Sequence, residues 1–172
     1  MKTNSLRILA LLLAAFTFFS CNKNKDDNDY FVKLKIEGNW VTFKTVMGEK
    51  GPDLSDPSYT NVGITANDDA MKDVFDIAIQ VDGPDFPVTT YDSDNMTYQL
   101  IMSYTKDAVT PNFKHFDIRP SDGRPNSRYL VTISSITDTE IRGSFNGNYL
   151  HDYQSDTDMN ITEGEFFVKR IR

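Results

Sequence analysis

The sequence has few of the residues from which metal and thiol sites are built. Its 172 residues include one cysteine, two histidines and one tryptophan. A single cysteine excludes an internal disulfide. Because this cysteine, Cys21, lies near the amino terminus, we expect no Cys/His catalytic pair. His115 and His151 form no HxH or HExxH spacing, so we expect solvated or edge-strand histidines, no metal site and no cofactor.

Basic residues are also scarce. The chain has 18 Lys and Arg against 25 Asp and Glu, a formal net charge of −7. Nucleic-acid binding and attraction to an anionic membrane surface both draw on clustered Lys and Arg. We therefore expect no nucleic-acid partner and no electrostatic attachment to a membrane.

Long apolar runs are missing too, since the longest, ILALLLAAFTFF, has 12 residues. A transmembrane helix needs about 20 residues to cross the bilayer. The run follows Lys2 and Arg7 and precedes Ser20, which is the pattern of a secretory signal. We predict that residues 1–21 are a signal peptide. Its removal leaves 16 basic against 25 acidic residues, a formal charge of −9.

The end of this signal, FFSC at 18–21, resembles the lipobox of bacterial lipoproteins. Ser20 matches the small residue and Cys21 the lipidated one, while Phe18 and Phe19 replace the usual leucine and small residue. Relaxed lipoboxes of this sort are similar to those of Bacteroidetes lipoproteins. The resemblance implies a diacylglycerol thioether on Cys21 and anchoring to the membrane through acyl chains, two or three of which hold a protein stably.

The segment after the cysteine, residues 22–29, contains no apolar residue and predicts a flexible acidic tether. Lys25, Asp26 and Asp27 resemble the short Lys-plus-acidic signal that sends some Bacteroidetes lipoproteins to the outer face of the outer membrane. An ordinary charged linker is the alternative. We expect an outer-membrane lipoprotein of the cell envelope. Whether the segment at 25–27 also displays it on the cell surface stays open.

The remaining residues, 30–172, predict one domain of β-strands. Apolar residues alternate with polar ones over several segments. The clearest sets are Phe75, Ile77, Ile79 and Val81; Met96, Tyr98, Leu100, Met102 and Tyr104; and Ile141, Phe145 and Tyr149. Further strands are predicted in FVKLKI, WVTFKTV, SYTNVGIT, HFDIR, RYLVTISSI and EFFVKRI. This period of two is typical of strands with one face in a core.

Short turns such as EGN at 37–39 and SDGRPN at 121–126 separate these strands, so neighbours should pair antiparallel. We predict an antiparallel β-sandwich of about 8 to 10 strands. A lipocalin-like β-barrel that holds a small apolar ligand is the alternative. The 12 Phe and 8 Tyr favour a filled interior.

The C-terminal third resembles the closing strands of small Bacteroidetes lipoproteins that carry a domain of unknown function. The resemblance rests on a ΦxGxFxG strand and a later xxGxFxV strand, and the opening IEGNWVTF is similar to the first hairpin of the same group. The matching residues are Ile141, Gly143, Phe145 and Gly147, then Gly164, Phe166 and Val168. It implies an architecture and no activity.

Candidate ligand-binding residues are aromatic side chains expected at loop tips, where a ring can stack on a sugar. They are Tyr59, Phe86, Tyr91, Phe113, His151 and Tyr153. We expect Trp40, which follows the first tight turn, to fill the core.

Acidic loops offer a weak calcium candidate at Asp156, Asp158 and Asn160. Ile161 and Phe167 occupy the positions where an EF-hand has glycine and glutamate, so an empty turn is favoured. No pair of carboxylates stands out as a glycosidase dyad, and Ser144 of GSFNG lies within a predicted strand.

The sequence therefore predicts a non-enzymatic binding or accessory module for protein or glycan. Its expected partners are the membrane, through the lipid, and a glycan or an envelope protein. A lipocalin-like carrier is the second hypothesis, and a secreted hydrolase is the third.

Overall fold

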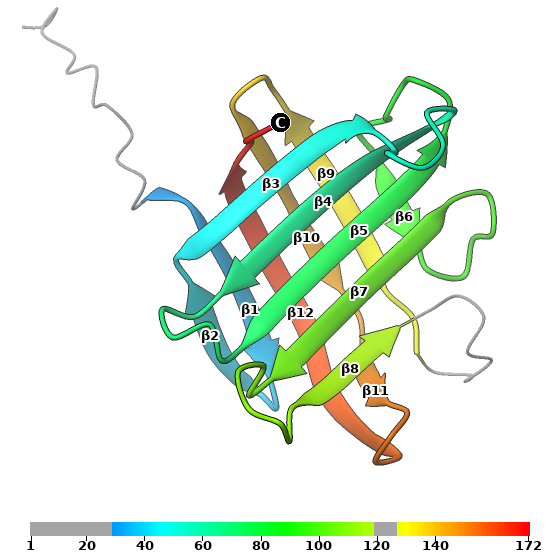
Figure 1. The fold of residues 1–172 in the computed structure, drawn as a ribbon. Helices are drawn as coiled ribbons and strands as arrows, with labels where there is room; N and C mark the ends of the chain where they lie inside the picture. The colour runs from blue at the N-terminus through cyan, green and yellow to red at the C-terminus, as the bar shows by residue number, and fades with distance from the viewer. Residues whose placement is uncertain (1–28, 119–126) are drawn as a thin grey trace, which may run out of the picture.

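A computed structural model of the protein describes residues 29–118 and 127–172 (Figure 1). The predicted signal peptide, Cys21, tether residues 22–28 and the turn at 121–126 lie outside the described residues. The strands are β1 (Phe31–Ile36), β2 (Asn39–Phe43), β3 (Thr45–Pro52), β4 (Tyr59–Asn67), β5 (Val74–Asp82), β6 (Thr90–Asp92), β7 (Gln99–Lys106), β8 (Lys114–Ile118), β9 (Leu130–Ile136), β10 (Glu140–Asn146), β11 (Tyr149–Asp152) and β12 (Thr157–Lys169). Among the described residues, no helix has the length and apolarity that crossing a bilayer requires.

The strands form two antiparallel layers (Figure 1). One, the β5 sheet, has the order β3-β4-β5-β7-β8-β11, and the other, the β10 sheet, has the order β2-β1-β12-β10-β9-β6. Strand β12 joins them, because residues 157–160 pair with β11 whereas residues 161–169 pair with β1 and β10. The predicted all-β antiparallel fold is confirmed, with 12 strands in place of 8 to 10.

A second contact between the layers lies at the other end of β12. The amide of Ile171 donates to the Gly48 carbonyl at 2.9 Å, which holds the end of the chain against β3. A Cβ on Gly48 would lie 2.6 Å from the Val168 side chain, so glycine allows this approach. Both ends of β12 are thereby fixed to the β5 sheet.

One contiguous core fills the space between the layers. Inward side chains of the two sheets meet there, and Phe75 of β5 stacks on Phe145 of β10 with ring centroids 5.4 Å apart. All four residues of the alternating set from Phe75 to Val81 are buried, as the period of two predicts. Side chains therefore occupy the place where a lipocalin-like barrel would hold its ligand.

Two predicted strands have different limits in the structure. The segment from Glu140 to Tyr149 is not one strand, because β10 ends at Asn146 and Tyr149 starts β11 in the other sheet. A Cβ on Gly147 would overlap the Tyr129 ring, which packs against the chain at this break. Met96, predicted on the inward face of its strand, is exposed and precedes β7.

Glycines and phenylalanines pair reciprocally between β10 and β12. Gly143 stands opposite Phe166, and Phe145 stands opposite Gly164. A Cβ on either glycine would overlap the ring opposite it, so each glycine leaves the space that its partner ring fills. The two sequence motifs of the C-terminal third are therefore the two halves of one packing arrangement.

This arrangement predicts that Gly164→Ala destabilises the fold. The new methyl group would overlap the Phe145 ring and lie 2.7 Å from the Lys33 carbonyl oxygen. Overpacking of this kind costs about 1–3 kcal/mol of unfolding free energy, measurable by urea denaturation. Gly51→Ala is the control, because the nearest atom to its Cβ would be 3.5 Å away on the flexible Arg172 side chain. Equal stability of the two variants would contradict the packing argument.

Candidate functional site

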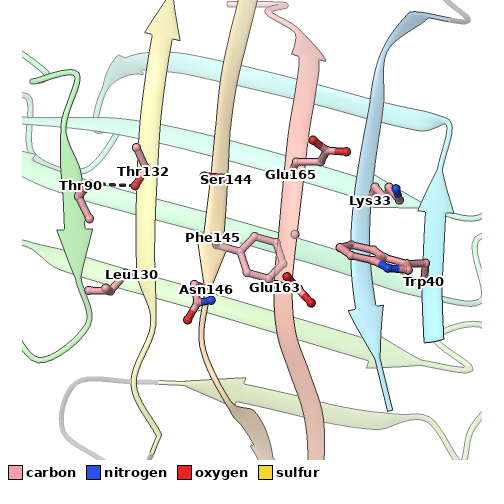
Figure 2. A pocket seen from close by; sticks show the side chains of 11 residues that line it. Lys33, Trp40, Thr90, Leu130, Thr132, Ser144, Phe145, Asn146, Glu163 and Glu165 are labelled. Atoms are coloured by element: carbon pink, nitrogen blue, oxygen red, sulfur yellow. Dashed lines mark hydrogen bonds between the residues drawn. The ribbon is translucent and has the colours of Figure 1, made fainter. Parts of the chain in front are cut away.

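A groove of about 620 Å³ crosses the outer face of the β10 sheet (Figure 2). Outward side chains of six neighbouring strands line it, and Gly164 leaves the edge of the Phe145 ring in its floor. Its lining is Lys33, Trp40, Thr90, Leu130, Thr132, Ser144, Phe145, Asn146, Glu163, Gly164 and Glu165.

Trp40 stands at the β2 end of this groove, and the prediction that it fills the core is wrong. Its side chain is 50% exposed. Glu37 and Gly38 both have positive φ, which makes the β1–β2 hairpin a two-residue turn that pairs Trp40 with Lys35. Because Lys35 lies between two inward residues of β1, its cross-strand neighbour Trp40 must face outward as well.

Two ammonium groups hold the indole ring from the β1 side. The Nζ of Lys33 lies 4.5 Å from the ring centroid and that of Lys35 lies 5.9 Å from it. Cation–π attraction at an exposed site is worth about 0.5–1 kcal/mol. Lys35 also forms an ion pair of 3.0 Å with Glu163, which connects the aromatic end of the groove to its centre.

The other end of the groove carries uncharged hydroxyl groups beside Leu130. The hydroxyl groups of Thr90 and Thr132 form a hydrogen bond of 2.8 Å between β6 and β9. Ser144 stands next to Thr132 on one side and Glu165 on the other, through the strand register. Both histidines belong to the β5 sheet, so neither of them lies beside Ser144 as an imidazole base.

Two of the sequence candidates lie inside the protein. Phe86 and Tyr91 are buried, with ring centroids 5.2 Å apart. Tyr91 donates its hydroxyl to the Pro87 carbonyl at 2.6 Å, and burial together with the neighbouring Tyr98 raises its pKa to about 12. In this structure the two rings belong to the core, and neither presents an exposed face on which a sugar could stack.

The other four candidates belong to the β5 sheet and its connections. Tyr59, at the start of β4, is half-buried, and Phe113, just before β8, is exposed. His151 is 1% exposed and packs edge-on against Tyr153, whose ring is exposed, with centroids 4.7 Å apart. The lining of the groove contains none of the six candidates.

The calcium candidates do not converge on one point. Nδ1 of His151 lies 2.7 Å from an oxygen of Asp158, and its Nε2 lies 3.5 Å from Asp156. Asn160 instead bonds Glu37 of the first hairpin through its amide groups. The part of the chain that the structure describes contains no group of three or more His, Cys, Asp or Glu placed to hold a metal ion.

A second polar arrangement, which the sequence reasoning missed, crosses the outer face of the β5 sheet. Register places its members side by side on five strands: Thr65, Asp76, Ser103, Asp117 and His151. Ser103, Asp117 and His151 are buried although they face outward. Thr65 donates to Asp76 at 2.7 Å. These residues come into one row only through the pairing of strands, which cannot be read from the sequence.

A comparison with known protein families, curated proteins and solved structures finds no match to this chain. The groove therefore has to be interpreted from its own chemistry.

Burial of Asp76 predicts a pH-dependent stability. Desolvation raises the pKa of its carboxyl group above the ordinary 3.8, against the opposing effects of Thr65 and His115. The folded chain then binds this proton more tightly than the unfolded chain, so ionisation of Asp76 destabilises the fold at neutral pH. We expect Asp76→Asn to raise the free energy of unfolding at pH 7, and the gain to vanish as the pH falls through the raised pKa.

The measurement is urea denaturation of the parent and the variant from neutral to acid pH. Asp85→Asn is the matched control, because Asp85 is exposed and should show no such pH-dependent gain. A gain for Asp76→Asn that is the same at every pH would exclude the titration of Asp76 as its cause.

Proposed function

We propose that this protein is a non-enzymatic lipoprotein of the cell envelope that binds a glycan on the outer face of its β10 sheet. The observation that carries the proposal is the groove in which a half-exposed Trp40 stands beside hydroxyl, amide, carboxylate and ammonium groups. An aromatic face packs against the apolar C–H face of a sugar ring, while the polar groups hydrogen-bond its hydroxyls. This combination fits a saccharide better than an apolar ligand.

A protein partner is less well supported than a glycan. Protein interfaces have centres that are depleted of charge and rich in apolar side chains. The centre of this groove has Glu163 and Glu165 beside the buried Phe145 ring, and its exposed apolar side chains, Trp40 and Leu130, stand at opposite ends. The lipocalin-like alternative needs a hollow interior, and the stacking of Phe75 on Phe145 argues against one.

The location in the proposal rests on the amino-terminal sequence. FFSC at 18–21 resembles a lipobox, and the eight residues that follow are polar and acidic. A tether of that length would hold the domain away from the bilayer, where a cell-envelope polysaccharide can reach it. Outer-membrane anchoring is part of the proposal because the lipobox and the segment at 25–27 resemble those of Bacteroidetes outer-membrane lipoproteins.

The binding site predicts that Trp40→Ala removes most glycan affinity. The full chain and the variant are run by affinity electrophoresis in gels that contain one soluble polysaccharide each, from an uncharged and a charged panel. We expect retardation of the parent by at least one uncharged polysaccharide, and affinity at least about tenfold lower for Trp40→Ala, as for other aromatic anchors.

Tyr153→Ala is the control for this experiment. Tyr153 is an equally exposed aromatic residue, but it precedes β12 at the edge of the β5 sheet. Its removal should leave retardation unchanged, and a loss with Tyr153→Ala alone would place the site on the other sheet. Release of shorter sugars during the run would contradict the non-enzymatic part of the proposal.

The anchor predicts that Cys21→Ala moves the protein out of the membrane fraction. Without the thiol, no diacylglycerol can be attached, and the excess of acidic residues disfavours electrostatic attraction to an anionic bilayer. Membrane fractionation and mass spectrometry of the processed amino terminus measure the effect. The lipoprotein assignment would be wrong if Cys21→Ala stayed in the membrane fraction like the parent and the parent carried no N-terminal acyl group.

A further inference from the structure

We propose that the groove holds an uncharged oligosaccharide as an extended chain that lies across the strands, from β9 to β2. This inference rests on the proposed glycan binding and adds the direction, length and charge of the ligand. It follows from how the strand register orders the side chains that line the groove (Figure 2).

Two parallel rows of side chains cross the sheet at right angles to its strands. The first row, here the hydroxyl row, is Thr90, Thr132, Ser144, Glu165 and Lys33. The second row, here the tryptophan row, is Leu130, Asn146, Glu163, Lys35 and Trp40. The residues between the two rows face inward, so a ligand in the groove is flanked by the hydroxyl row on one side and by the tryptophan row, which is apolar at its two ends, on the other.

The length of the rows matches several sugar units. Each row runs over five neighbouring strands, the hydroxyl row from β6 to β1 and the tryptophan row from β9 to β2. Strands lie about 4.8 Å apart, so the distance from the first to the last is roughly 19 Å. A single sugar on Trp40 would leave Asn146, Thr132 and Leu130 without a contact, whereas a chain of sugars reaches them all.

The polar groups of the rows fit hydroxyl groups, which both donate and accept hydrogen bonds. Carboxylates only accept, an ammonium only donates, and the amide and hydroxyls do both. Along the tryptophan row an amide, a carboxylate and an ammonium follow one another in Asn146, Glu163 and Lys35. A repeating pattern of sugar hydroxyls can pair with such a series without introducing a charge.

The charges of the groove disfavour an ionised ligand of either sign. Glu165 stands in the middle of the groove and would repel a uronate or a sulfated sugar, and the ion pair of Lys35 with Glu163 lowers the attraction that Lys35 could offer such a ligand. At the tryptophan end, the ammonium groups of Lys33 and Lys35 lie beside the ring and would repel an amino sugar stacked there. An uncharged chain meets neither cost.

The experiment is a titration of the full chain with saccharides of increasing length. Trp40 is the only tryptophan, so its fluorescence reports on the site itself. The probes are cello-, manno- and laminari-oligosaccharides from the monosaccharide to the hexasaccharide, with oligogalacturonates and glucosamine oligomers as the anionic and cationic series. Within one neutral series, we expect affinity to rise at least about tenfold from disaccharide to pentasaccharide and then to level off. The charged series should bind more weakly at each length.

Variants at the far end of the groove test the direction. We expect Asn146→Ala to weaken the pentasaccharide severalfold and to leave the disaccharide, seated on Trp40, unchanged. Tyr153→Ala should change neither, and urea denaturation checks that each variant is folded.

Failures of the two proposals are distinguishable. Equal affinity for all lengths, or an equal effect of Asn146→Ala on both lengths, would overturn the extended chain while glycan binding stands. Tighter binding of a charged series would overturn the uncharged ligand in the same way. If no saccharide binds and Trp40 responds to an envelope protein instead, the proposed function fails and this inference fails with it.

Discussion

The pairing of β10 with β12 is the constraint on which both the core and the groove depend. On the inner side of this ladder, each of Gly143 and Gly164 leaves room for the phenylalanine ring opposite it. On the outer side, the alternate residues Ser144 and Glu165 stand opposite one another in the groove. A shift of one residue would exchange the two faces, so the packing of the rings also fixes the register of the polar row.

The first hairpin extends the same register to the edge of the sheet. Lys33 pairs with Glu165 on one side and with Thr42 on the other. The tight turn at Glu37 and Gly38 then leaves no freedom in the position of Trp40, which stands opposite Lys35. Glu37 accepts two hydrogen bonds from Asn160, so β12 also holds this turn in place. Trp40 is thereby positioned by rigid strands and not by a loop.

The sequence predicted the all-β antiparallel class because a period of two is a local property. Trp40 was misplaced for a related reason: its size suggested the core, although the inward Leu34 and the two-residue turn already implied that it faces outward. The loop-tip aromatics Phe86 and Tyr91 were misjudged because burial depends on which layers meet over a residue. The rows of both sheets could not be predicted at all, since they join residues far apart in the chain.

An exposed tryptophan on an edge strand has a simpler explanation, which is protection of the edge of β2 that pairs with no other described strand. The orientation of the ring argues against it. The indole lies over β1, beside the ammonium groups of Lys33 and Lys35, and points along the groove toward β12 (Figure 2). A side chain that protected the edge would turn the other way, over the outer edge of β2. Cation–π contacts and the Lys35–Glu163 ion pair instead keep the ring facing the polar rows of the groove.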